Sequence, residues 1–239
     1  PMYVKEISRC HNIQWAKKIS LNSAYGAIGN QYFRFYNVHQ ATAITTAGQF
    51  IIQYIEQQVN KYMNDILQTK DKVDYIVASD TDSIYLCLDK LVDKVCKDKT
   101  KEQKINFINK VVENKLEPFI DKCFNELARY TNAFQQKMVM KRECIADKGI
   151  WTAKKRYMLN VLDEEGFRFE EPKLKIMGIE AVKSSTPEVC RVAIKEAIKI
   201  VMNKEETDLH NYIAKFREEY KQYEPEQIAF PRSCNNLRK

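Results

Sequence analysis

Apolar residues recur at helical spacing over most of the chain, so the pattern of hydrophobic and polar positions predicts mainly long helices. The first helix is expected over residues 4–25, ending at Gly26, and a turn and an aromatic segment at 32–36 should follow it. A second helix is expected over residues 38–67. One face of this second helix carries Ile44, Ala47, Ile51, Ile55, Val59, Tyr62 and Ile66. Shorter helices are predicted over residues 89–97, 105–130 with a break at Pro118, 188–203 after Thr186-Pro187, and 205–223.

A few segments between the helices are rich in β-branched and aromatic residues and are predicted to be strands. Residues 73–87 contain two such runs on either side of an acidic segment, which predicts buried strands joined as a hairpin. Residues 138–145 and 151–162 are predicted as two further strands separated by a turn at 147–149, and residues 170–178 as a loop. The fold class is therefore α+β, with a small antiparallel sheet backed by long helices.

Composition narrows the function only slightly. The chain has 239 residues, of which 44% are hydrophobic, and a formal net charge of +7, a mild signal for a polyanionic partner such as nucleic acid. Seven cysteines without a CxxC pair and three scattered histidines favour reduced thiols over a disulfide framework or a zinc site. No apolar run is long enough to span a membrane and no signal peptide opens the chain, so we expect a cytoplasmic protein and no membrane partner.

The strongest chemical signal is the pair Asp80 and Asp82, two residues apart at the tip of the predicted hairpin. Two carboxylates held near an apolar layer are costly unless a divalent cation neutralises them, and such a pair suits Mg²⁺. A calcium loop is excluded, because Tyr85 and Leu91 stand where glycine and glutamate would be needed. An ordinary solvated turn remains the alternative.

Two further groups of residues add chemistry of the same kind. Lys18, Asn22 and Tyr25 share one helical face and offer a cation, an amide and a ring, the groups that a nucleoside triphosphate needs; an ordinary amphipathic helix is the alternative. Residues 137–160 carry seven basic and two acidic side chains, centred on Lys154-Lys155-Arg156-Tyr157. Strand alternation would send Lys155 and Tyr157 to one face and Lys154 and Arg156 to the other, which suits nucleic acid or a strand edge kept basic against aggregation.

These motifs, in this order, resemble those of the family B replicative DNA polymerases, most closely the enzymes of T-even-type tailed bacteriophages. The similar segments are Lys18-x3-Asn22-Ser23-x-Tyr25-Gly26, Asp80-Thr81-Asp82-Ser83, Lys154-Lys155-Arg156-Tyr157, Glu170 to Gly178 and Lys183 to Pro187. The resemblance implies a polymerase palm with a small antiparallel sheet, a fingers helix and the base of a helical thumb. It implies fingers at residues 1–30, palm at 31–176 and the start of the thumb at 177–239.

The resemblance also implies roles. Asp82 would be the direct ligand of two catalytic Mg²⁺ ions, for which Mn²⁺ could substitute. Asp80 would lie beside it as a weaker or indirect ligand, and Glu143 would be a supporting acid near the metals. Lys18 and Asn22 would hold a deoxynucleoside triphosphate, and Tyr25 would lie under the nascent base pair. The contacts to primer-template DNA would come from Lys154, Lys155, Arg156, Tyr157, Lys173 and Lys175.

The resemblance further implies that parts of the family's machinery are missing. A second palm aspartate, the exonuclease domain and most of the thumb would lie outside this chain, so we expect a DNA-directed DNA polymerase in partial form, inactive alone and partnered by the rest of the polymerase. Its location would be the host cytoplasm if viral. The alternatives are the palm of another polymerase class, such as a reverse transcriptase, and a non-catalytic basic nucleic-acid-binding module.

Overall fold

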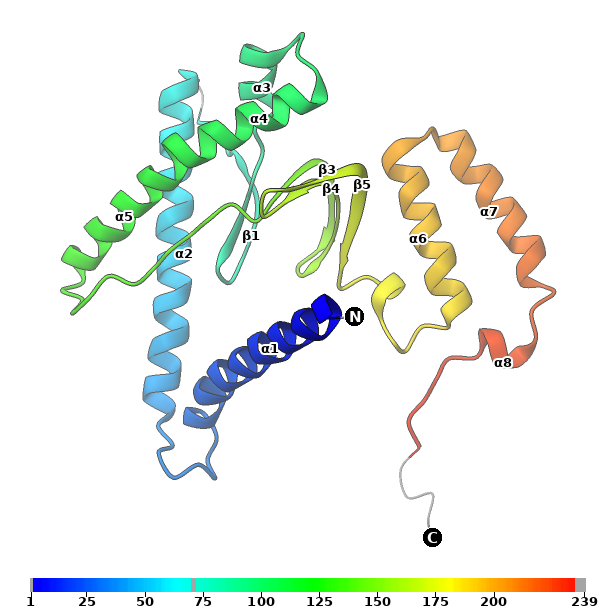
Figure 1. Cartoon of the computed structure of the whole chain (residues 1–239), viewed down its shortest axis with the longest axis horizontal. Helices are drawn as coiled ribbons and strands as arrows, with labels where there is room; N and C mark the ends of the chain where they lie inside the picture. Colours follow the sequence, from blue (N-terminus) through cyan, green and yellow to red (C-terminus); the bar gives the residue numbers. More distant parts are fainter. Residues whose placement is uncertain (1, 70–71, 235–239) are drawn as a thin grey trace. The chain divides into compact units, whose positions relative to one another are not determined.

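The computed structural model describes residues 2–69 and 72–234, with no description of the Met2 side chain. The chain divides into two compact units, one ending at Leu88 and the other beginning at Asp89 (Figure 1). The architecture is mixed, with long helices and two small antiparallel sheets, which confirms the predicted α+β class. The assignment of residues 1–30, 31–176 and 177–239 to fingers, palm and thumb stays a prediction.

The first unit contains helices α1 (Met2–Ile28) and α2 (Val38–Leu67) and the hairpin β1 (Ile76–Asp80) and β2 (Ser83–Leu86). The side chain of Asn37 accepts from the amide of Gln40 and caps α2, so this helix has the predicted bounds. Helix α1 continues past Gly26, where the sequence predicted its end. The predicted apolar face of α2 is buried at Ile55 and Val59 but exposed at Ile44, Ala47 and Ile66.

The second unit begins with helix α3 (Asp89–Cys96) and a long helical segment that changes its winding. Helix α4 (Lys101–Val111) passes through a π-helical turn, η1 (Val112–Leu116), into α5 (Glu117–Tyr130). The amide of Glu117 donates to the carbonyl of Val112, five residues back, immediately before Pro118. A proline has no amide hydrogen and cannot donate a helical hydrogen bond. The π-helical turn just before Pro118 accommodates this missing donor in the backbone hydrogen bonds of the helix. The helix is not broken at Pro118, which lies in the first turn of α5; the winding changes instead at residues 112–116, and α4 begins four residues earlier than predicted.

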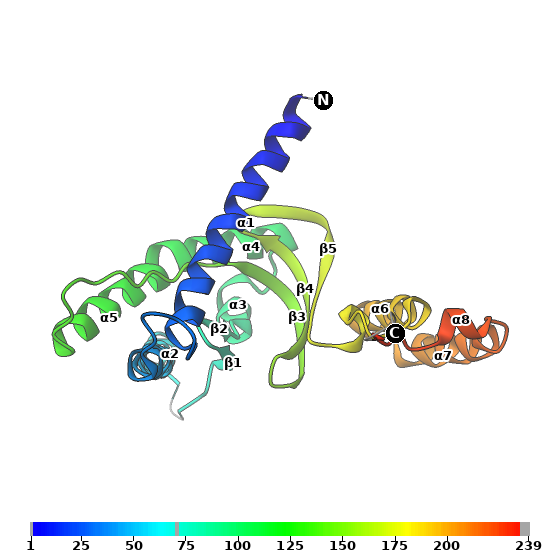
Figure 2. The same ribbon diagram turned by 90° about the horizontal axis from the view of Figure 1, so that it is seen from below.

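A three-stranded antiparallel sheet with the order β3-β4-β5 follows. Strand β3 (Cys144–Ala153) pairs with β4 (Arg156–Glu164), which pairs with β5 (Phe167–Met177). Figure 2 shows the curvature of this sheet. Pro172 of β5 stands in an edge strand, where the register with β4 is irregular and an amide donor is not required.

This sheet corrects three predictions. The predicted turn at 147–149 was wrong, because those residues continue β3; the side chain of Asp147 accepts from Asn160 of β4 at 2.7 Å, and the Trp151 ring lies over Gly149. The chain instead turns at residues 154–155. The predicted loop at 170–178 was wrong as well, because pairing with β4 makes 170–177 part of β5. Residues 138–143 are not strand, so the first predicted strand begins only at Cys144.

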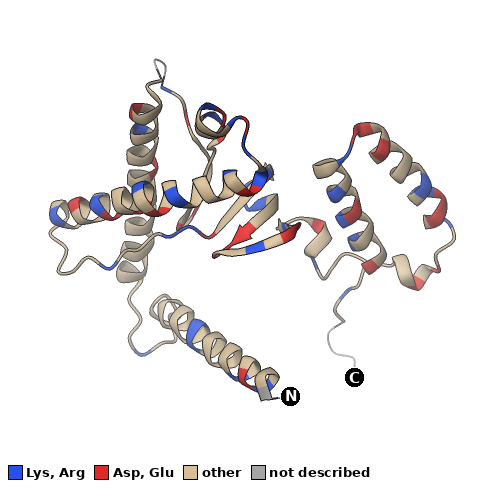
Figure 3. Cartoon of the chain, turned by 45° about the horizontal axis from the view of Figure 1, so that its top comes forward, with Lys and Arg blue, Asp and Glu red and all other residues tan. Residues whose placement is uncertain are grey.

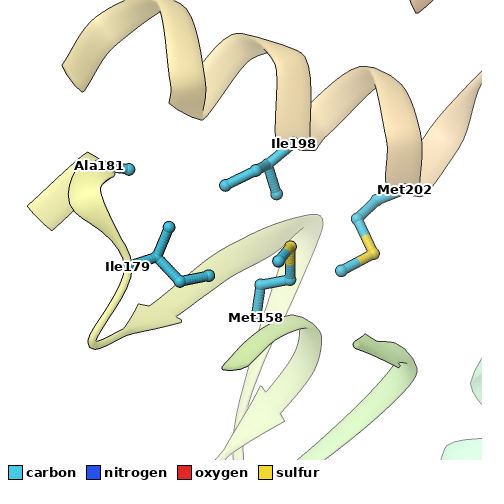
Figure 4. Close-up of a cluster of buried hydrophobic side chains, with 5 residues drawn as sticks. All are labelled: Met158, Ile179, Ala181, Ile198 and Met202. Atoms are coloured by element: carbon cyan, nitrogen blue, oxygen red, sulfur yellow. The ribbon is translucent and has the colours of Figure 1, made fainter. Parts of the chain in front are cut away.

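A short 3₁₀ turn, η2 (Glu180–Val182), connects the sheet to helices α6 (Glu188–Asn203), α7 (Glu206–Tyr220) and α8 (Pro225–Ile228). Pro187 caps α6 instead of occupying its first turn, and α8 was not predicted. Helix α6 packs on the sheet through a buried cluster, shown in Figure 4, of Met158, Ile179, Ala181, Ile198 and Met202. The ammonium of Lys148 on β3 donates to the carbonyl of Met202 in the last turn of α6, where a cation is favourable.

A buried ion pair ties the sheet to the segment before it. The guanidinium of Arg142 donates to Asp163 of β4 at 2.6 Å, and the backbone amide of Arg142 donates to the side chain of Glu117 at 3.1 Å. Asp163 is only 1% exposed, and its second oxygen has no hydrogen-bond partner among the described residues. Removing Arg142 would therefore leave a buried carboxylate without its charge partner.

Among the described residues, no helix combines the length and the apolar character needed to cross a membrane. The seven cysteines are free thiols. Burial raises the pKa of Cys144 and of Cys123, which keeps these thiols protonated and unreactive at neutral pH.

Candidate functional site

The structure places the acidic pair at the tip of the β1–β2 hairpin, as the sequence predicted. Asp80 ends β1 and pairs with Ser83, while Thr81 and Asp82 form the turn between them. Asp80 is half-buried and Asp82 is exposed. The flanking strands are less buried than expected, since Val77 is 54% exposed.

Bonds within this tip fix its shape. The amide of Asp82 donates to the carbonyl of Asp80 at 2.6 Å, and the hydroxyl of Ser83 donates to the same carbonyl at 3.1 Å. The hydroxyl of Thr81 donates to the carboxylate of Asp80 at 3.0 Å. Thr81 has a φ of +53°, a left-handed conformation that is unfavourable for a β-branched residue. The tip is therefore a strained turn that carries two carboxylates, two residues apart in the sequence.

The stem of the hairpin is held by two asparagines that sequence reasoning missed. The side chain of Asn64 on α2 accepts from the amide of Val73 at 3.0 Å and donates to its carbonyl at 2.8 Å. The side chain of Asn60 accepts from the amide of Tyr75 at 2.8 Å. Both asparagines stand next to buried apolar positions of α2, Val59 and Met63. An amide side chain on the border of an apolar face was the signal that could have revealed them.

The chemistry of the tip suits Mg²⁺ only in part. Asp80 and Asp82 supply hard carboxylate oxygens, and Mg²⁺ is commonly held by one or two carboxylates together with waters and substrate phosphates. Residues 2–69 and 72–234 contain no group of three or more potential metal ligands. The tip therefore offers two carboxylates, and no third potential ligand of this kind joins them among the described residues.

Helix α1 carries the predicted nucleotide-binding residues, and most of its ribbon in Figure 3 has the colour of uncharged residues. Lys18 and Asn22 line a shallow, open hollow whose lining residues all belong to the exposed helix α1: Cys10, Ile13, Gln14, Lys17 and Leu21 are the others. Tyr25 does not line the hollow and is 42% exposed. The structure thus brings two of the three predicted residues together at one open hollow.

The basic motif occupies a turn, which overturns the predicted alternation along a strand. Lys154 and Lys155 connect β3 to β4, and only Arg156 and Tyr157 belong to a strand. Lys155 has a φ of +61°, so its side chain does not follow the strand period. The rings of Tyr157 and Trp151 pack with centroids 6.3 Å apart at the base of this turn. Strand β4 is also the central strand and not an edge.

Two residues that sequence reasoning did not select contact this turn. Gly178 has a φ of +68°, and a Cβ atom placed there would overlap with the carbonyl oxygen of Lys155. The carboxylate of Glu180 accepts from the guanidinium of Arg156 and, at 3.0 Å, from Lys183. The hydrogen bond from Lys183, together with the charge of Arg156, lowers the pKa of Glu180 below its ordinary value. Glu180 is therefore ionised at the neutral pH at which DNA binding would be measured.

Three other predicted residues, Glu143, Lys173 and Lys175, are engaged in ion pairs. The ammonium of Lys175 donates to Glu143, and that of Lys173 donates to Glu164 at 2.7 Å and lies 5.2 Å from the centroid of the Phe169 ring. Partial burial alone would lower the pKa of Lys175, but the hydrogen bond and charge of Glu143 outweigh it, so this pKa is raised. The catalytic role of Glu143 and the DNA contacts of both lysines stay predictions.

Comparison with known proteins gives one consistent result. Residues 4–232 match the family model for DNA polymerase family B. The chain is 43% identical over 236 residues to a DNA-directed DNA polymerase of Enterobacteria phage T4, and 44% identical over 233 residues to that of Escherichia phage RB69. These alignments cover 95% and 93% of this chain and 26% of each relative, so the chain spans about a quarter of the length of the curated relatives it matches.

Proposed function

This chain belongs to DNA polymerase family B, and on that premise we propose that it is part of a DNA-directed DNA polymerase that adds deoxynucleotides to a primer 3′ end. The proposal rests on the hairpin tip, where Asp80 and Asp82, two residues apart in the sequence, flank the strained residue Thr81. A structural or solvated turn has no need for such strain, whereas a metal-binding turn gains defined ligand positions from it.

In this proposal Asp82 and Asp80 hold Mg²⁺, or Mn²⁺ in its place. When bound, two such ions stabilise the attacking and leaving oxygens of an in-line phosphoryl transfer. Lys18 and Asn22, together at the hollow on α1, hold the triphosphate, and Tyr25 supports the base pair. The protein's contribution is positioning and charge neutralisation, because phosphoryl transfer requires little covalent work from side chains.

The basic turn supplies the contacts to primer-template DNA. The exposed Lys154 and the left-handed Lys155 project charge from a tight turn, and backbone phosphates are the natural partners of such lysines. Lys173 and Lys175 add positive charge on β5, although each already pairs with a carboxylate. Glu143 contributes as a supporting acid that holds Lys175.

We also propose that the 239-residue chain alone does not extend a primer. Among the described residues no group of three potential metal ligands is present, so Asp80 and Asp82 would hold a metal without a third protein carboxylate, and the chain corresponds to about a quarter of its relatives' length. Metal-dependent incorporation of nucleotides by the purified chain would contradict this part of the proposal.

The decisive experiment places this chain in a complete enzyme. The matching quarter of the phage T4 relative is replaced by this chain, and primer extension in Mg²⁺ is compared for the unmodified hybrid, Asp82→Asn and Asp65→Asn. Asp65 is exposed on α2 and is not a proposed ligand, so it controls for loss of one charge. We expect Asp82→Asn to abolish extension while duplex binding persists; full activity of Asp82→Asn would refute the proposal.

A non-catalytic DNA-binding module is the remaining candidate, and the basic turn favours it. Such a module would bind DNA equally well in EDTA and in Mg²⁺ and would be indifferent to Asp82→Asn. Mn²⁺ binding by the isolated chain, followed by electron paramagnetic resonance, separates the two. The polymerase proposal expects weaker Mn²⁺ binding for Asp80→Asn with Asp82→Asn than for Asp65→Asn, and equal binding would favour the module.

A further inference from the structure

The segment that leaves the sheet, residues 178–181, contacts both the basic turn and the hydrophobic core. Gly178 and Glu180 meet the turn, whereas Ile179 and Ala181 are buried in the cluster with Met158 of the sheet (Figure 4). The short segment is therefore fixed to the sheet by its apolar residues while its other two residues contact the turn.

The contact at Gly178 is a backbone contact that admits no side chain. A Cβ atom at this position would overlap with the carbonyl oxygen of Lys155 and lie 3.2 Å from Cγ of Arg156. The positive φ of Gly178 also disfavours any residue with a Cβ. Lys155 itself has a positive φ, which is uncommon for a residue other than glycine.

The contact at Glu180 acts on the next residue of the turn. Its carboxylate binds the guanidinium of Arg156, 24 positions earlier in the chain, and also the ammonium of Lys183. Arg156 is the first residue of β4, so this ion pair fixes the end of the turn. Neither residue is deeply buried, and the pair therefore orients the turn more than it stabilises the fold.

We propose that Gly178 and Glu180 are positioning residues that set the conformation of the Lys154–Lys155 turn and thereby its grip on primer-template DNA. The inference rests on the proposed function of this turn. It adds that residues 178–181, the segment that leads into α6, set the shape of the turn that contacts DNA.

The experiment uses the 239-residue chain with Trp15→Phe, which leaves Trp151 as the single tryptophan, next to Tyr157 at the base of the turn. Two readouts are taken. The first is the conformation of the turn, from Trp151 emission and the rate of trypsin cleavage after Lys154 or Lys155. The second is the dissociation constant for a primer-template duplex, measured over a range of salt concentrations.

Gly178→Ala is expected to accelerate cleavage at the turn and to weaken duplex binding about ten-fold, the effect of roughly 1.4 kcal/mol. Its matched control is Gly166→Ala at the β4–β5 turn, where φ is also positive but an added Cβ would meet open space. This control carries the same kind of backbone strain without the clash. Equal effects of the two variants on cleavage and binding would overturn the inference.

Glu180→Gln leaves the backbone unchanged, so it carries the test alone if Gly178→Ala does not fold. Its control, Glu188→Gln, removes the same charge from an exposed site at the start of α6. A positioning role predicts weaker DNA binding for Glu180→Gln, by about two- to five-fold, and faster cleavage at the turn. Removal of a carboxylate that merely repels DNA would strengthen binding, and that result would overturn the inference.

Lys155→Ala separates failure of the inference from failure of the proposed function. If Lys155→Ala leaves duplex binding and its salt dependence unchanged, the turn does not grip DNA and the proposed function of this turn is wrong. If Lys155→Ala weakens binding while Gly178→Ala and Glu180→Gln behave like their controls, only the inference is wrong.

Discussion

The acidic hairpin, β1–β2, and the basic hairpin, β3–β4, both reverse the chain through a tight turn, but the contacts at the two turns come from different parts of the chain. Each reverses through a two-residue turn that contains one left-handed non-glycine residue, Thr81 in the first and Lys155 in the second. At the acidic tip the hydrogen bonds join residues 80–83 to one another. At the basic turn, the local contacts of Thr152 with Arg156 and of Trp151 with Tyr157 are joined by contacts from a later segment, through Gly178 and Glu180.

This difference shows why one site was visible in the sequence and the other was misplaced. A tip held by four consecutive residues depends on local chemistry, and local chemistry is what a sequence pattern records. A turn imposed by a segment more distant in the chain depends on the sheet being formed first. Its conformation depends on tertiary contacts, and the alternation of residues along a strand does not predict such contacts.

The largest expected effect tests the long-range support of the basic hairpin. Arg142→Ala leaves Asp163 buried without its charge partner, so we expect the free energy of unfolding to fall by about 3–5 kcal/mol. Urea denaturation followed by Trp151 emission, in the Trp15→Phe background, measures it. Lys141→Ala, at the exposed neighbouring position, is the control and should change stability little. A similar loss in both variants would mean that the buried pair does not support the sheet.

A smaller effect is expected at the stem of the acidic hairpin. Asn64→Ala removes the side chain that pairs with both the amide and the carbonyl of Val73, which should cost about 1–3 kcal/mol in local stability. Amide hydrogen exchange in β1 and β2 measures this local opening. Gln57→Ala, on the exposed face of α2, is the control. Unchanged protection in Asn64→Ala would show that the hydrogen bonds of Asn64 do not stabilise the hairpin.

Relief of the backbone strain at Thr81 is expected to increase stability, whereas the two substitutions above decrease it. Asparagine tolerates the left-handed conformation better than a β-branched residue, so Thr81→Asn should raise the free energy of unfolding by up to about 1 kcal/mol. Thermal denaturation measures this gain, and Thr81→Ser, which keeps the hydroxyl, is the comparison. If the strain serves the metal site, Thr81→Asn should also weaken Mn²⁺ binding. A loss of stability in Thr81→Asn would contradict the strained turn.

Elements with a strong period were predicted well, and elements defined by pairing were not. The bounds of α2 follow from its apolar period and the Asn37 cap. Strand β5 was mistaken for a loop, because its lysines and Pro172 lack an alternating pattern and only pairing with β4 makes it a strand. Gly149 indicated a turn, but the ring of Trp151 uses the space beside it.

The candidate site divides in the same way. Asp80 and Asp82 were placed at the hairpin tip from sequence alone, because the carboxylates interrupt two apolar runs. Asn60 and Asn64, which hold the stem, were missed, since a helical asparagine shows its partner only when the following strand is in place. Glu180 was missed because its partner Arg156 lies 24 positions earlier in the chain, and the residues next to Glu180 give no sign of that contact.

The smallest effect is a pH dependence on the sheet that carries the basic turn. The hydrogen bond from Lys173 lowers the pKa of Glu164 below its ordinary value, against a small opposing effect of burial. A carboxylate with a lowered folded-state pKa stabilises the fold at pH values above its unfolded pKa of about 4.3, and this contribution is lost as pH falls through the folded value. Glu164→Gln should therefore lower the melting temperature equally at pH 7 and pH 5.5, and the difference should shrink below about pH 4. Glu171→Gln, an exposed carboxylate on the neighbouring edge strand β5, is the control. A difference that persists unchanged at pH 3 would show that Glu164 acts by packing and not by its charge, and the long-range ion pairs of this sheet would then lose one member.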